Sequence, residues 1–226
     1  MIMAMAVLSA VLFSCVREEM TCDKELIVVQ RIGEGGYVYT RGTVISSNTD
    51  LKEETFGLYG SLTPNASVPQ PYFNASATVN ADLTATISPL QYWPGLLNAS
   101  MKFFSWYPYN DANAPTASFT DPGEMVLNYT ANASAANHVD VLAAISGPVW
   151  VEGVNIHFYH TLTKVTFTFK KVAPVPDEVI IEKIEFQNVG KSGKLAMTEI
   201  PTTTTKNGKP KVAWSDVATA KVVSTL

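Results

Sequence analysis

The stretch VNIHFYHTLTKVTFTFKKV, residues 154–172, decides the fold class of this chain. Apolar and polar residues alternate from 154 to 162, and the parity of this alternation is reversed in residues 165–169. A period of two is typical of a β-strand with one buried face. Because that period cannot change phase without an inserted residue, we predict a β-bulge or a sharp bend at Thr163-Lys164.

Similar signals recur along the rest of the chain. Runs rich in Val, Ile, Thr, Tyr and Phe are separated by Gly, Pro, Asn and Asp, which is typical of an all-β protein. Further strands are expected at residues 25–30, 37–46, 102–107 and 179–186. The run 102–107 has large apolar residues on both parities, so we expect this strand to be covered on both faces.

Turn-forming residues connect these expected strands. The sequence Gly33-Glu34-Gly35-Gly36 would join the first two strands, and three prolines in residues 63–71 indicate an exposed loop. Apolar residues at helical spacing are weak throughout, and the stretches that tolerate a helix best are 135–145 and 216–225. We therefore expect an antiparallel all-β fold.

The charge and the cysteine content exclude several classes of protein. The 226-residue chain has a net charge of −4 and 16% charged residues, so it lacks the basic surplus that nucleic-acid binding requires. Its two cysteines, Cys15 and Cys22, both lie near the N-terminus, which leaves no thiols for a disulfide framework, a zinc cluster or a cysteine nucleophile in the remaining chain. Nucleic acid is therefore not an expected partner.

The N-terminal segment MIMAMAVLSAVLFSC, residues 1–15, contains an uncharged apolar run that ends in a cysteine. This run is too short to span a bilayer and is typical of a signal peptide. Residues 12–15, LFSC, resemble a bacterial lipobox, in which the signal is cut before the cysteine and the thiol then carries lipid. We predict a lipoprotein signal peptide over residues 1–15, lipidation of Cys15, attachment to a membrane through that lipid, and a tether over residues 16–24.

Residue types that carry catalysis or bind metals do not form a convincing constellation. His157 and His160 are three positions apart, which would place them on opposite faces of a strand, so no metal site is expected. His138 and Asp140 flank a valine, but no activated nucleophile accompanies them. We therefore expect no catalytic residues and no cofactor, and we predict that the protein is not an enzyme.

Several segments, taken in order, resemble one family. They are Cys15 of the lipobox, YTRG at 39–42, MKFFSWYP at 101–108, DVLAA at 140–144 and FYHTLTKV at 158–165. Together they resemble the fimbrillin-like family of Bacteroidetes, the type V pilins and their accessory subunits. The resemblance extends over most of the chain.

The resemblance implies a transthyretin-like antiparallel β-sandwich fold with two domains. The first would cover residues 25–153 and the second would begin at residue 154. Members of the family run longer, so residues 154–226 are expected to form only the start of the second domain, and the chain is expected to be truncated at its C-terminus.

The resemblance also implies a function at the cell surface. The chain would be a structural or accessory subunit of a pilus, exported as a lipoprotein to the outer membrane and contributing to adhesion. A trypsin-like maturation protease would cut after an arginine that follows the first strand, with Arg41 as first choice and Arg31 as second. Removal of the strand 25–30 would open a groove that a strand from another pilin subunit fills.

Two other functions remain open at this point. A glycan-binding outer-membrane lipoprotein with a β-sandwich fold would use exposed tryptophans, such as Trp93, Trp106 or Trp150, as stacking platforms. A β-sandwich hydrolase would need a pair of carboxylates, and nothing in the sequence selects such a pair.

Overall fold

A computed structural model describes residues 25–34, 45, 47–65, 67–134, 137–150, 153–163, 168–170, 180–181, 183–197 and 212–225. The regular elements of these residues are β-strands, which confirms the all-β prediction. In chain order they are β1 (Val29–Glu34), β2 (Thr55–Thr63), β3 (Gln70–Val79), β4 (Ala85–Ser88), β5 (Ser100–Tyr107), β6 (Thr116–Ser118), β7 (Met125–Thr130), β8 (Leu142–Val149), β9 (Val154–His160), β10 (Lys183–Met197) and β11 (Val212–Thr225). Within this part of the chain, no helix is long and apolar enough to cross a membrane.

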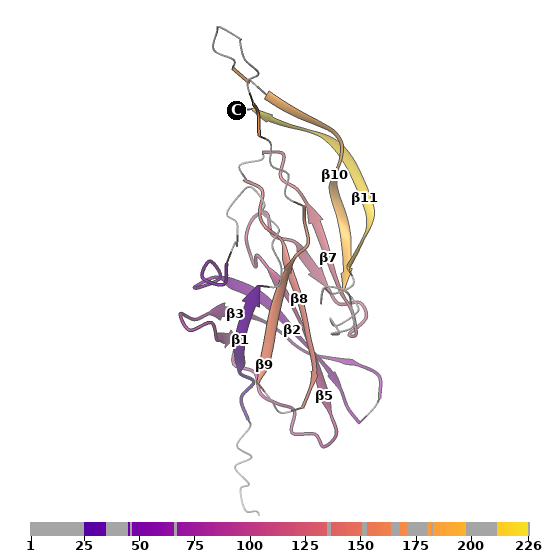
Figure 1. Ribbon diagram of the computed structural model, residues 1–226. Coiled ribbons are helices and arrows are strands. Elements are labelled where there is room, and N and C mark those ends of the chain that lie inside the picture. Colours follow the sequence, from indigo (N-terminus) through magenta and orange to yellow (C-terminus); the bar gives the residue numbers. More distant parts are fainter. Residues whose placement is uncertain are drawn as a thin grey trace, which may run out of the picture.

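The strands form two sheets (Figure 1). Seven strands close on themselves in the order β1-β4-β3-β2-β5-β8-β9, and we call this closed sheet the barrel. Its closing pair, β1 with β9, is parallel, whereas the other neighbours in the barrel are antiparallel. The remaining strands form an antiparallel sheet in the order β11-β10-β7-β6. The sequence predicts an antiparallel fold, and the pair β1–β9 departs from it. These two strands are parallel because both begin at the same end of the barrel.

Two hydrophobic cores lie on the two sides of strands β2, β5 and β8. The inner core fills the barrel, and the outer core lies between these three strands and β7 and β10. Strand β5 contributes to both: Met101 and Phe103 are buried in the inner core, and Phe104 and Trp106 are buried in the outer core. The prediction that residues 102–107 are covered on both faces is therefore confirmed.

Strand β9 shows the alternation of buried and exposed residues that the sequence predicts for residues 154–162. Val154, Ile156 and Phe158 are fully buried in the inner core, whereas Asn155 and His157 are exposed. The strand ends at His160, because the next residue turns back to bond the carbonyl of Val141. Residues 168–170 are in no strand, so the predicted strand ends early, and the predicted bulge at Thr163-Lys164 includes a residue outside the described part.

The N-terminal strand is placed differently from its prediction. Strand β1 extends through Gly33 and Glu34, so these two residues form strand and not the predicted turn. Space beside Gly33 is tight, since a Cβ there would lie 3.0 Å from Nδ1 of His157 on β9. Of the second predicted strand, 37–46, the described residue is Ile45, which is buried in the inner core.

The structure can also be compared with the predictions for the loop 63–71, the strand 179–186, the domain boundary and the cysteines. In the loop between β2 and β3, Asn65, Ser67 and Val68 are exposed as predicted, whereas residues 63, 70 and 71 of the predicted loop belong to the strands. Strand β10 begins at Lys183 and runs to Met197, later and further than the predicted 179–186. The division into domains at Val154 stays a prediction, and β9, which follows it, supplies three residues to the inner core. Cys15 and Cys22 lie outside the described residues.

Burial on both faces of β5 predicts matched costs for two neighbouring residues. We expect Phe103→Ala and Phe104→Ala each to lower the free energy of unfolding by about 3–5 kcal/mol, because each leaves a cavity in a different core. Urea unfolding of the two variants measures these costs. Leu97→Ala is the control: this side chain is 87% exposed, so its truncation should change the free energy by no more than about 0.5 kcal/mol. A Phe104→Ala variant as stable as the control would contradict burial of the outer face.

Candidate functional site

The segment 25–34 closes the barrel, and we call the region where it lies the seam. On one side the segment runs parallel to β9, with five register pairs from Val29–Val154 to Glu34–Phe158. The amide of Val154 also donates to the carbonyl of Val28 at 2.9 Å. A β-bulge between Val29 and Arg31 interrupts this pairing.

On its other side the segment faces residues 83–93. The amide of Ile27 donates to the carbonyl of Gln91 and the amide of Trp93 donates to the carbonyl of Glu25, both at 2.9 Å. The amide of Ile32 donates to the carbonyl of Leu83 at 2.8 Å. The ladder between β1 and β4 itself consists of one register pair, Val29 with Ala85. The segment is therefore held by separate hydrogen bonds on this side and by a longer strand ladder on the β9 side.

Apolar side chains of the segment seal the inner core. Ile27, Val29 and Ile32 are at most 3% exposed and belong to that core. Burying each of these side chains contributes roughly 1.5–3 kcal/mol by its transfer from water. Gly153, just before β9, has no side chain, and a Cβ there would collide with the side-chain amide of Gln30. Removal of the segment would therefore open an apolar groove between β9 and β4, with unpaired backbone groups along β9.

Of the predicted cleavage and lipidation residues, the structure describes Arg31. Arg31 lies in β1 at the bulge, and its side chain is exposed. Arg41 follows β1 in the chain but, like Cys15, lies outside the described residues.

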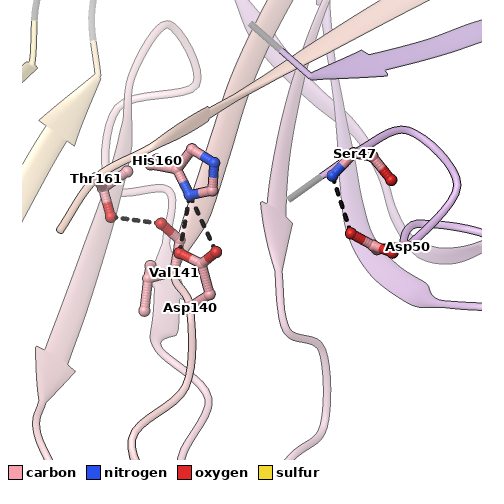
Figure 2. A network of polar contacts seen from close by, with 6 residues as sticks. All are labelled: Ser47, Asp50, Asp140, Val141, His160 and Thr161. Atoms are coloured by element: carbon pink, nitrogen blue, oxygen red, sulfur yellow. Dashed lines mark hydrogen bonds and ion pairs between the residues drawn. The ribbon is translucent and has the colours of Figure 1, made fainter. Parts of the chain in front are cut away.

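A second feature is a buried polar pair, Asp140 and His160, which Figure 2 shows from close by. Nδ1 of His160 lies 3.0 Å from both carboxylate oxygens of Asp140, and the two side chains are 0–1% exposed. Because a carboxylate accepts hydrogen bonds, Nδ1 of His160 carries the proton. His160 is thus bonded to a residue of the segment before β8, and its side chain is buried.

Thr161, the residue after His160, connects this pair to the second sheet through hydrogen bonds. The hydroxyl of Thr161 donates to the carbonyl of Val141 at 2.8 Å (Figure 2). The amide of Thr161 donates to the same carbonyl at 3.0 Å. The indole Nε1 of Trp214 on β11 donates to the carbonyl of Thr161 at 3.0 Å. The pair therefore lies where β8, β9 and β11 meet, and it stabilises that junction.

The other histidines, His138 and His157, do not join a catalytic or metal-binding group among the described residues. Nε2 of His138 bonds the carbonyl of Asn132 at 2.9 Å, so this residue does not join Asp140 and His160. His157 is exposed on the opposite side of β9 from Val154. Among the described residues there is no group of three or more His, Cys, Asp or Glu that could hold a metal ion.

Another buried polar contact lies at the opposite end of the barrel from the start of β1. The phenol of Tyr107 donates to a carboxylate oxygen of Glu54 at 3.0 Å. Burial, and then the negative charge of Glu54, raise the pKa of Tyr107, so its hydroxyl stays protonated and keeps donating. This contact joins the end of β5 to the residue before β2 and has no catalytic partner.

The tryptophans proposed as stacking platforms are mostly unavailable. Trp93 is 7% exposed and packs edge-on against Phe103 in the inner core, with ring centroids 6.1 Å apart. Trp106 is 5% exposed in the outer core. Both residues are core-forming, which corrects the prediction that they are exposed, and Trp150 alone of the three is on the surface, at 58% exposure.

The buried pair generates a stability prediction. Asp140→Ala should lower the free energy of unfolding by about 3 kcal/mol, because it leaves a buried imidazole N–H without its acceptor. The matched control is the ion pair of Lys194 and Asp216, whose atoms are also close, at 2.8 Å, but whose side chains are 53% and 65% exposed. Lys194→Ala, which breaks this exposed pair and leaves Asp216 with its positive φ in place, should scarcely move the midpoint of the same urea titration. Equal costs in the two variants would contradict a structural role for the Asp140–His160 pair.

Comparison with known proteins gives one result. A family model described as fimbrillin-like matches residues 40–225, which is most of the chain and includes strands β2 to β11. Searches of curated proteins and of solved structures return no match. Fimbrillins are structural subunits of pili and not enzymes, and they associate with other pilin subunits at the cell surface. On this match the chain belongs to the fimbrillin-like family.

Proposed function

We propose that this chain is a subunit or accessory component of a surface pilus, assembled by protease-triggered strand exchange at the seam and contributing to adhesion. The observation that carries the proposal is that one terminal segment, 25–34, seals the inner core. Family membership supports the pilus, and the seam supports the mode of assembly. The barrel and the second sheet would correspond to a transthyretin-like sandwich domain together with the start of a second domain.

The proposed exchange has a simple physical basis. Loss of the segment leaves the amides and carbonyls of β9 that face β1 without partners, and it leaves three apolar sites of the inner core empty. An extended strand from another subunit would restore both the backbone bonds and the apolar contacts. Such a strand needs apolar side chains that match Ile27, Val29 and Ile32.

The extent of β1 supports Arg41 over Arg31 as the proposed cleavage site. A cut after Arg31 would leave Ile32, which is fully buried, attached to the rest of the protein and still in the seam. A cut after Arg41 would release all of β1, since the strand ends at Glu34. The family model also begins at residue 40, so β1 lies outside the matched range and Arg41 lies inside it.

Cys15 completes the proposal at the membrane. We propose that lipid on Cys15 holds the precursor at the outer membrane, and that cleavage after Arg41 separates the pilin from this lipid. The lipobox-like LFSC sequence supports this step.

The arginines can be tested separately. We expect limited trypsin treatment of the purified full chain, in the presence of a full-length pilin partner, to give ladders of subunits on a native gel. Arg41→Ala should abolish the ladders, because the segment 25–34 stays covalently attached and reoccupies the seam. Arg31→Ala is the matched control and should leave the ladders intact.

The outcomes distinguish the parts of the proposal. Ladders from Arg41→Ala but not from Arg31→Ala would assign the cleavage to Arg31. Complete cleavage after Arg41 with only monomer on the gel would contradict strand exchange at this seam.

A further inference from the structure

One end of the barrel carries most of the large apolar side chains that the described residues expose. Strands β1, β3, β5 and β9 begin at this end and β2 and β8 end there, as the pairing registers require (Figure 1). Of the 13 large apolar residues exposed in the described part of the chain, nine lie at this end. We call it the apolar end.

The loops at the tip expose the largest apolar fractions. Val68, in the β2–β3 loop, is 77% exposed, and Leu97, in the turn before β5, is 87% exposed. Leu96 beside it is 53% exposed, and Trp150, directly after β8, is 58% exposed. A long apolar side chain that projects from a turn to this extent is not part of any core in the described structure.

A strip of apolar residues continues from the tip along the outside of the seam. Leu26 forms an isolated antiparallel bridge with Tyr92, and the same register places Val28 beside Leu90. The phenol of Tyr72 on β3 donates to the carbonyl of Tyr92 at 2.8 Å, which brings a second aromatic ring into the strip. These five side chains are 37–55% exposed.

The apolar end carries few charges, and those near its tip are acidic. Residues 64–72 and 88–101 contain no Asp, Glu, Lys or Arg, and residues 25–30 and 148–155 contain one each, Glu25 and Glu152. Asp121 lies at the margin, since a Cβ on Gly123 would lie 3.2 Å from its carboxylate and 3.8 Å from Pro69 of the β2–β3 loop. Lys102, also at the margin, lies with its ammonium 5.8 Å from the ring centre of Phe104, on the side of the outer core. A surface with aromatic and aliphatic tips and few charges is suited to an interface with lipid.

The chain enters the barrel at this same end. Glu25, the first described residue, pairs with Trp93 there, and ten residue steps separate it from Cys15. Fully extended, ten residues span about 35 Å, and a flexible chain of that length has a mean end-to-end distance of roughly 17 Å. A lipid on Cys15 would therefore keep the apolar end close to the membrane surface, where a weak contact is sufficient because the local concentration is high.

From these observations we infer that the apolar end is a membrane-contact face, which lies against the lipid surface and orients the precursor before cleavage. The inference rests on the proposed lipidation of Cys15. Trp150, Tyr72 and Tyr92 would lie at the level of the headgroups, where amphipathic aromatic rings are favoured, and Leu96 and Leu97 would enter the boundary of the acyl chains.

The native tryptophans allow a direct test. The full chain, as purified from the cell that exports it, is incorporated into vesicles of phosphatidylcholine that carry bromine atoms near the glycerol backbone. Bromine quenches tryptophan only on close approach. We expect quenching in the native chain, and its loss in Trp150→Phe, because Trp93 and Trp106 are buried and the half-buried Trp214 bonds Thr161 at the other end of β9. A Trp150→Phe/Val217→Trp variant is the matched control: residue 217 is 50% exposed on β11, and a tryptophan there should stay unquenched. Leu96→Glu/Leu97→Glu should reduce the quenching of Trp150.

Other results would either contradict the membrane contact or show that it does not depend on a lipid at Cys15. Vesicle-bound chain with equal quenching in the native and Trp150→Phe forms overturns the contact, as does a chain that stays off the vesicles. A blue-shifted but unquenched Trp150 would mean that a second copy of the chain covers this end, and it also overturns the contact. Mass spectrometry of Cys15 tests the lipid independently. Quenching confined to Trp150 in a chain without that lipid would support the contact and contradict the lipidation.

Discussion

Burial of β2, β5 and β8 on both faces is the constraint on which the rest of the structure depends. Phe103 and Phe104 are neighbours in sequence, and each is completely buried, in a different core. Such a layer requires cover on both sides. It also requires close packing between its own strands, and Gly57, the register partner of Trp106, leaves the space that the indole occupies. The barrel and the second sheet are the two covers that these three strands need.

The two covers differ in how they could be removed. The outer core is covered by β7 and β10, which belong to the middle of the second sheet and pair with each other over six residues. The inner core is completed by β1, a single strand at the start of the described chain, with one ladder pair to β4. Loss of β1 would therefore expose the inner core along one line and leave the outer core intact. This difference supports the proposal that strands are exchanged at the seam.

Patterns within one strand could be predicted from the sequence, whereas placements between strands could not. The alternation in β9 and the double-sided apolar character of β5 are local properties, and both are confirmed. Strand β11 includes residues 216–225, which tolerate a helix, and pairing with β10 overrides that weak preference. The burial of Trp93 and Trp106 depends on which layers are stacked. Asp140 and His160 are brought together by the pairing of β8 with β9, and a separation of 20 positions carries no signal of its own.

The topology also explains why the closing strand is separable from the fold that it completes. The hairpins of β2 with β3 and of β8 with β9 join residues that are close in sequence, whereas β1 pairs with β9 across 125 positions, from Val29 to Val154. Contacts between distant residues form after local ones, because the entropy of loop closure must be lost first. We therefore expect the barrel to form as an open sheet that β1 closes last. A strand that arrives last contributes little to the assembly of the others, and this supports the proposed exchange at the seam.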